Sequence, residues 1–181
     1  REDLEKALPK LDILGEVPFV SQLDTTKDSR GIFAESARVI RSNISFKLVG
    51  EGCKVILSTS SIKGEGKTIS AFNIAASYAA TGEKVLLLGA DLRNPRLHNV
   101  LEIERLGTER GLTSFLVADS NKEISDHIFS IDIFRSTIDV MLSGPIPPNP
   151  AELLGSKEFE AILNTLKQNY DYIIIDSAPL V

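Results

Sequence analysis

The stretch KVILSTSSIKGEGKT, residues 54–68, decides the fold of this chain. It begins as a short apolar run, typical of a buried strand, and ends on Gly-Lys-Thr, where an alanine-rich helical segment starts. A phosphate-binding loop has the pattern G-x-x-x-x-G-K-[ST] between a strand and a helix. The chain matches the last three positions of this pattern and carries Ser61 in place of the leading glycine. We therefore predict a loop that binds the phosphates of a nucleotide.

Each part of this loop has an expected task. Gly64 and Gly66 allow a tight backbone whose N–H groups point inward at an anion, and the start of the helix adds partial positive charge. We expect Lys67 to reach the β- and γ-phosphates and the Thr68 hydroxyl to bind Mg²⁺. The alternative is a glycine-rich turn with a solvated lysine, which the flanking strand and helix disfavour. The predicted nucleotide-binding residues are Ser61, Ile62, Lys63, Gly64, Glu65, Gly66, Lys67 and Thr68.

Outside the loop, strands and helices alternate along the chain. The predicted strands are continuous apolar runs, as expected where helices cover both faces of a parallel sheet. Alternation of this kind predicts a doubly wound, mostly parallel α/β domain of three layers, of the P-loop type. The pattern predicts strands at 54–59, 84–88, 138–142 and 172–175, and helices at 32–48, 68–80, 111–117, 149–154 and 157–168, with a break near residues 155–156.

The ends of the chain differ from this regular middle. Residues 1–31 are expected to form a connector, with a short helix at 3–8 and an extended segment at 13–20, which Pro18 would confine to a sheet edge. The domain proper is expected at 32–181. A strand as apolar as 172–175 is usually central and needs neighbours. Because the sequence stops six residues after it, we expect the domain to continue beyond Val181.

Two aspartates follow predicted strands. Asp91 comes after the strand at 84–88 and Asp176 after the strand at 172–175. Ligands of open α/β sheets bind outside the carboxyl ends of the strands, and Mg²⁺ prefers oxygen ligands. An aspartate at a strand end can instead cap a helix, but two of them beside a phosphate loop favour a metal site. We predict Lys67, Asp91 and Asp176 as catalytic residues, and Thr68 with the two aspartates as metal ligands.

Composition narrows the choice of partners. The 181 residues carry 20 basic and 25 acidic side chains, a net charge of −5, which argues against nucleic acid as a partner. The single cysteine excludes an intrachain disulfide framework. No apolar run approaches the ~18 residues that span a bilayer, and the first residues do not form a signal peptide. These features predict a soluble domain in a reducing compartment, most simply the cytoplasm.

The motifs resemble those of the bacterial tyrosine kinases of capsule and exopolysaccharide synthesis, which are P-loop proteins with a deviant Walker A motif. The resemblance extends from about residue 14 to residue 179. Residues 144–154, GPIPPNPAELL, are similar to a family stretch that precedes a helix and are the most specific match. The other matches are 61–68 to the Walker A motif, 89–95 to Walker A′ and 173–176 to Walker B.

The resemblance implies a function and its setting. It implies a protein-tyrosine autokinase that uses ATP with Mg²⁺, releases ADP, and regulates capsule or exopolysaccharide synthesis and export. It further implies protein tyrosine substrates and a transmembrane activator of the polysaccharide co-polymerase type, fused or separate. The domain would then lie at the cytoplasmic face of the bacterial inner membrane.

Glu35, Arg38 and Arg41 match the family motif E-x-x-R-x-x-R. At three-residue spacing they spread over roughly 120° of one helix face. From the residues alone, a solvated charged face with weak i,i+3 pairs is the simpler interpretation. The resemblance implies instead that they mediate self-association into a ring-like homo-oligomer, of which an octamer is one form.

Two departures from the family pattern leave three functions open. Gly89 stands where Walker A′ has its first aspartate, to which the resemblance assigns a role as base or metal-orienting group. The tyrosines are Tyr78, Tyr170 and Tyr172, none of them in a tyrosine cluster at the C-terminus. A tyrosine kinase and a nucleotide-binding regulatory module with weak catalysis therefore both remain open. The third function is an ATPase switch like those that position division machinery or plasmids, but Ile62 occupies the place of their signature lysine.

Overall fold

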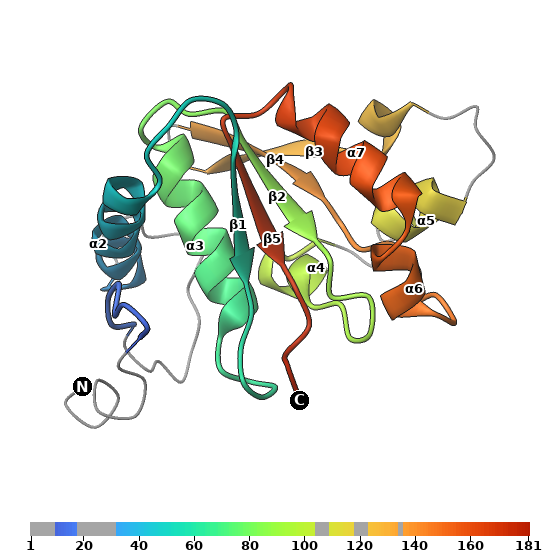
Figure 1. Ribbon diagram of the computed structural model, residues 1–181, viewed down its shortest axis with the longest axis horizontal. Helices are drawn as coiled ribbons and strands as arrows, with labels where there is room; N and C mark the ends of the chain where they lie inside the picture. The colour runs from blue at the N-terminus through green and yellow to red at the C-terminus, as the bar shows by residue number, and fades with distance from the viewer. Residues whose placement is uncertain (1–9, 18–31, 104–108, 118–122, 134–135) are drawn as a thin grey trace.

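The computed structural model describes residues 10–17, 32–103, 109–117, 123–133 and 136–181. Its sheet has five strands in the order β1-β5-β2-β4-β3 (Figure 1). Four strands pair in parallel, and β3 pairs antiparallel with β4. The predicted mostly parallel sheet is confirmed, and β5, the most apolar predicted strand, lies between two neighbours as expected. The strands are β1 (Lys54–Ser58), β2 (Val85–Gly89), β3 (Phe129–Ile133), β4 (Ser136–Met141) and β5 (Tyr172–Asp176).

Helices cover both faces of this sheet, because successive side chains of a buried strand point to opposite sides. Leu87 and Ile174 pack with α2, α3 and α4 in one apolar cluster, whereas Leu86 and Ile173 pack with α5, α6 and α7 in a second cluster. The three-layer, doubly wound arrangement is thus confirmed. The helices are α2 (Ile32–Lys47), α3 (Lys67–Ala79), α4 (Leu97–Val100), α5 (Leu112–Val117), α6 (Pro150–Leu154) and α7 (Lys157–Lys167), with a 3₁₀ helix, η2 (Ile124–His127).

The break predicted near residues 155–156 separates α6 from α7. Ser156 caps α7, since its Oγ accepts a hydrogen bond from the Phe159 N–H at 3.2 Å. The predicted strand at 138–142 is observed as β4, and it forms an antiparallel hairpin with β3, a strand that was not predicted. In β3, apolar and polar residues alternate and so do half-buried and exposed positions, as in an edge strand, so this strand has no continuous apolar run.

The predicted edge strand in the N-terminal segment is wrong over its described part. Residues 12–17 have no strand structure and pack against α2 instead. The Asn43 side-chain amide donates to the Leu14 carbonyl at 2.6 Å, and Lys47 pairs with Asp12 at 2.6 Å. Hydrogen bonds to a helix therefore replace the expected sheet pairing. Residues 18–20 and the predicted helix at 3–8 lie outside the described residues.

Candidate nucleotide-binding site

The predicted phosphate loop lies between β1 and α3, at the carboxyl end of the sheet. Gly64 and Gly66 have φ values of +94° and +83°, a left-handed conformation that side-chain-bearing residues rarely adopt. Gly66 is the N-cap of α3, so the first N–H groups of that helix face the loop. The Glu65 carboxylate accepts hydrogen bonds from the Ser61 and Ile62 N–H groups at 2.8 and 3.2 Å and holds the loop closed on itself. This is the backbone geometry that binds phosphate.

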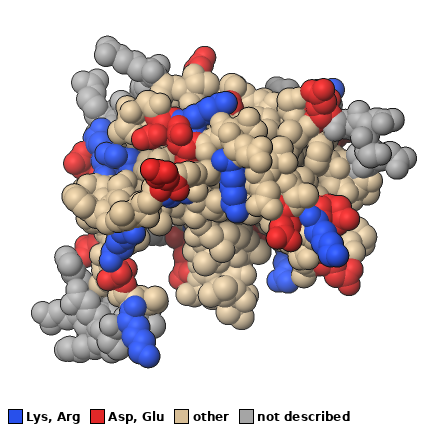
Figure 2. Space-filling model, turned by 45° about the horizontal axis from the view of Figure 1, so that its top comes forward, with Lys and Arg blue, Asp and Glu red and all other residues tan. Residues whose placement is uncertain are grey.

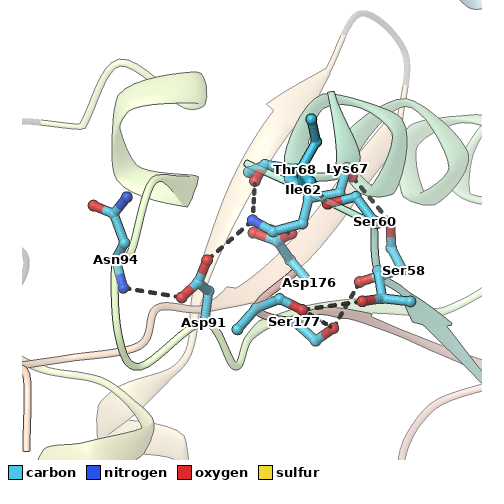
Figure 3. A network of polar contacts seen from close by, with 11 residues as sticks. Ser58, Ser60, Ile62, Lys67, Thr68, Asp91, Asn94, Asp176 and Ser177 are labelled. Atoms are coloured by element: carbon cyan, nitrogen blue, oxygen red, sulfur yellow. Dashed lines mark hydrogen bonds and ion pairs between the residues drawn. The ribbon is translucent and has the colours of Figure 1, made fainter. Parts of the chain in front are cut away.

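Three strand ends bring the predicted catalytic side chains together. Lys67 Nζ lies 3.0 Å from Asp91 Oδ2 and 3.9 Å from Asp176 Oδ1 (Figure 3). The Thr68 hydroxyl lies 3.5 Å from the same ammonium. The side chains of Asp91 and Asp176 are 4% and 1% exposed, against 11% for Lys67. The register explains the convergence, because Asp176 is paired with the last residues of both β1 and β2.

Burial decides the electrostatics of Asp176. Desolvation raises the pKa of its carboxyl to about 6, while Lys67 and Thr68 act to lower it and Asp91 raises it further. Among the described residues, Asp176 Oδ1 is buried without a hydrogen-bond partner. A buried oxygen of this kind fits a metal ligand. Thr68, Asp91 and Asp176 provide the oxygen donors that Mg²⁺ prefers, so the residues present fit this ion.

A cavity of about 460 Å³ opens beside these groups. The segment between β2 and α4 forms one wall, and it is anchored because the Asn94 N–H donates to Asp91 Oδ1 at 2.9 Å. Asp91 therefore contacts Lys67 with one oxygen and holds its own loop with the other. The lining residues are Lys63, Gly64, Gly66, Lys67, Thr68, Ile69, Asp91, Arg93, Asn94, Arg96, Val100, Ala178, Pro179 and Val181.

Position 89, where Walker A′ has its first aspartate, is tightly enclosed. A Cβ on Gly89 would lie 2.9 Å from Ser143 Oγ and 3.0 Å from Ser143 N. Ser143 is 3% exposed and follows β4 at the same edge of the sheet. Ser143 was not among the predicted site residues, although its position directly after the predicted strand at 138–142 is a signal that could have pointed to it. Its hydroxyl occupies the space that a side chain at position 89 would need.

The E-x-x-R-x-x-R residues do not act as one group. Glu35 and Arg38 form an exposed pair within α2, with Arg38 Nη2 2.7 Å from Glu35 Oε2. Arg41 turns toward α3, where its Nε donates to Ser77 Oγ at 3.1 Å and its guanidinium lies 5.9 Å from the centre of the Tyr78 ring. The predicted interface role of the three residues stays a prediction.

The three tyrosines are all engaged in contacts within the chain. Tyr78 is 1% exposed and stacks on Tyr172, with ring centres 3.8 Å apart. The Tyr170 hydroxyl donates to Asp139 Oδ2 at 2.8 Å, and burial raises the pKa of this phenol. None of the three is presented as an open phosphate acceptor.

The fold and the site define a nucleotide-binding domain of the P-loop class. A family model described as "AAA domain" matches residues 53–181. The chain is 38% identical over 154 residues to the tyrosine-protein kinase YwqD of Bacillus subtilis, covering 85% of this chain and 62% of that protein. It is 34% identical to the putative tyrosine-protein kinase CapB of Staphylococcus aureus, covering 89% of this chain and 68% of that protein.

A solved structure agrees with these relatives. The chimerical protein CapA2B2 aligns with a TM-score of 0.85 at 36% identity, over 99% of this chain and 75% of that one. The chain therefore belongs to the family of bacterial tyrosine-protein kinases. It spans 62% of the length of YwqD. In the described parts of the chain, no helix combines the length and the apolar character of a membrane span.

Proposed function

We propose that this chain is the catalytic domain of an ATP-dependent protein-tyrosine kinase that regulates capsule or exopolysaccharide synthesis. One observation carries the proposal: the Lys67 ammonium lies within 4 Å of carboxylate oxygens of both Asp91 and Asp176. These groups lie at the start of α3, whose N-cap Gly66 has a left-handed backbone conformation. Membership in the tyrosine-protein kinase family supports the same reaction.

The proposed mechanism assigns a task to each group. The loop N–H groups and Lys67 bind the phosphates of ATP, so Lys67 exchanges its ion pair with Asp91 for a phosphate contact. Thr68, Asp91 and Asp176 hold Mg²⁺, which supplies charge neutralisation on the phosphate oxygens when bound. Since Gly89 has no side chain to accept a proton, Asp91 also receives the proton of the acceptor hydroxyl.

The acceptor tyrosine belongs to another protein or to chain outside these residues, because the three tyrosines described above are packed away. We propose that the domain acts at the cytoplasmic face of the inner membrane, beside a transmembrane activator. It assembles there as a ring, such as an octamer, through Glu35, Arg38 and Arg41. On the face in Figure 2, acidic and basic side chains are interspersed rather than gathered into one basic surface, which favours protein partners over nucleic acid.

A second candidate is a nucleotide-binding regulatory module with slow catalysis. Ser143 fills the space beside Gly89, so no carboxylate can enter there without displacing it. A positioned base contributes about 10²–10⁴-fold to a rate. The ATPase-switch alternative is less well supported, since Ile62 occupies the position of the signature lysine and its side chain is exposed.

The test measures binding and transfer separately. Calorimetry should show Mg·ATP binding to the parent, at least a hundredfold loss in Lys67→Met, and no loss in Lys157→Met, which removes an exposed lysine of α7. Incubation with Mg·ATP and a tyrosine peptide should then yield phosphotyrosine. Binding without any transfer would favour the regulatory module, and ATP hydrolysis without phosphotyrosine would favour the switch. Absence of binding in the parent would refute all three functions.

A further inference from the structure

Two arginines line the proposed nucleotide cavity without a partner among the residues that the structure describes. Arg93 and Arg96 lie on the segment between β2 and α4, and both side chains are exposed. Within the described residues, neither guanidinium forms an ion pair or a side-chain hydrogen bond. An arginine at the wall of a cavity without a counter-charge is available to an anionic ligand.

The two arginines are held in place relative to the predicted reaction centre. Asp91 anchors their segment through the Asn94 N–H at 2.9 Å and contacts Lys67 Nζ at 3.0 Å. The Val100 N–H donates to the Arg96 carbonyl at 3.2 Å, so the far end of the segment is fixed by the first turn of α4. The backbone that carries Arg93 and Arg96 is therefore tied to the side chains that meet ATP.

They line the same cavity as the phosphate loop but come from a different segment of the chain. In Figure 3, Asn94 and its segment lie on the side of Asp91 opposite to Ser60 and Ile62 of the loop. In an in-line displacement the acceptor oxygen enters opposite the leaving group. Because the loop is assigned to the phosphates of ATP and ADP is the leaving group, an acceptor entering opposite ADP would come from the side of Asp91 and the segment that carries the two arginines.

The charged side chains around the cavity are mostly basic. Among the described residues that line it, four are basic (Lys63, Lys67, Arg93 and Arg96) and one, Asp91, is acidic, although the whole chain carries a net charge of −5. Asp91 pairs with Lys67. Lys63 belongs to the phosphate loop, so the two arginines are the basic groups outside the loop that have no acidic partner among these residues. Guanidinium groups bind carboxylates through paired, charge-assisted hydrogen bonds. Val100 lines the same cavity and offers an apolar surface to an aromatic ring.

We propose that Arg93 and Arg96 form the acceptor subsite and select a tyrosine flanked by acidic residues. The carboxylates of the acceptor segment contact the two guanidinium groups, and the tyrosine ring packs near Val100. This inference rests on the proposed kinase function and names the substrate class of that reaction, an acidic tyrosine-bearing segment.

The test compares two peptides that differ only in charge, EEEYEE and QQQYQQ, by fluorescence anisotropy on protein saturated with Mg·AMPPNP. The parent should bind the glutamate peptide at least tenfold more tightly. Arg93→Ala/Arg96→Ala should abolish this preference and leave the affinity for Mg·AMPPNP within threefold. Lys157→Ala/Lys167→Ala, which removes two exposed charges from α7, should keep the preference.

Several results would overturn the proposal. Equal affinity of the parent for the two peptides, or an unchanged preference in the double arginine variant, removes the acceptor subsite and leaves the kinase function standing. A loss of more than threefold in Mg·AMPPNP affinity in that variant assigns the arginines to the nucleotide. The same peptide titration without nucleotide distinguishes failure of the acceptor subsite from failure of the proposed kinase function. If the parent does not bind Mg·AMPPNP but keeps an arginine-dependent preference, the kinase function fails and the anionic site stands.

Discussion

The carboxyl group of Asp176 should lower the stability of the metal-free protein at neutral pH, and Asp176→Asn should remove this effect. The side chain is 1% exposed, and its Oδ1 has no hydrogen-bond partner among the described residues. Lys67 lies nearer to Asp91, at 3.0 Å, than to Asp176, at 3.9 Å. The substitution therefore removes a buried charge and leaves the closer ion pair in place.

The magnitude follows from the pKa of this carboxyl, which burial raises from 3.8 to about 6. A shift of one pKa unit between the unfolded and folded states corresponds to about 1.4 kcal/mol, so ionisation of Asp176 costs the folded state about 3 kcal/mol at pH 7.5. Asparagine must still bury an amide, which makes this value an upper limit. At about 2–4 °C per kcal/mol for a chain of this size, Tm should rise by up to roughly 10 °C.

The sign of the pH dependence follows from proton binding. Between pH 4 and pH 6 the folded state holds a proton on Asp176 that the unfolded state has released. This contribution to the free energy of unfolding is fully present below about pH 4 and is lost as pH rises through about 6. The stability gain of Asp176→Asn should therefore be largest at pH 7.5 and close to zero at pH 4.

The assay is thermal unfolding followed by circular dichroism, with EDTA and without nucleotide, at pH values from 4 to 7.5. Asp132→Asn is the matched control, because it removes the same charge from an exposed position in β3. A variant less stable than the parent at pH 7.5, or equally stabilised at every pH, would refute the reasoning. The variant should also lose Mg·ATP binding, since a proposed metal ligand is gone.

Three further outcomes are expected. Gly89→Asp should raise the rate of phosphotyrosine formation at least tenfold and lower the free energy of unfolding by about 1–3 kcal/mol. Ser143→Gly in the same chain should recover part of that loss of stability. An unchanged rate would show that another group supplies the base. Arg41→Ala should lower the free energy of unfolding by about 1–2 kcal/mol, and Arg38→Ala by less than about 0.5 kcal/mol, because only Arg41 bonds to α3. Alanine at Glu35, Arg38 and Arg41 together should lower the mass seen by light scattering with nucleotide, and a parent that is already monomeric at high concentration would contradict the predicted interface.

Much of the site could be predicted because its signals are local. A strand, a glycine-rich loop and a helix follow one another in residues 54–80, and this order suffices to place Lys67 and Thr68. Asp91 and Asp176 could be added because each directly follows an apolar run. In a parallel sheet all such ends lie at one edge, so residues far apart in sequence meet without any detailed knowledge of packing.

Local signals fail where a side chain's role depends on which element packs against it. The spacing of Glu35, Arg38 and Arg41 places them on one helix face but does not say that Arg41 bonds to Ser77. The extended appearance of residues 13–17 does not reveal that a helix, rather than a strand, donates to the Leu14 carbonyl.

The sequence by itself determined the fold class, the phosphate loop and the two aspartates at the strand ends, because the period of apolar residues and the backbone freedom of glycine act within a few residues of chain. Only the tertiary structure decided the strand order, the hairpin of β3 with β4, the contact of Ser143 with the space beside Gly89, and the placement of Arg93 and Arg96 on the nucleotide cavity. These features arise from packing between segments that are distant in sequence. Such contacts depend on both segments together, so the pattern of apolar residues within either segment does not reveal them.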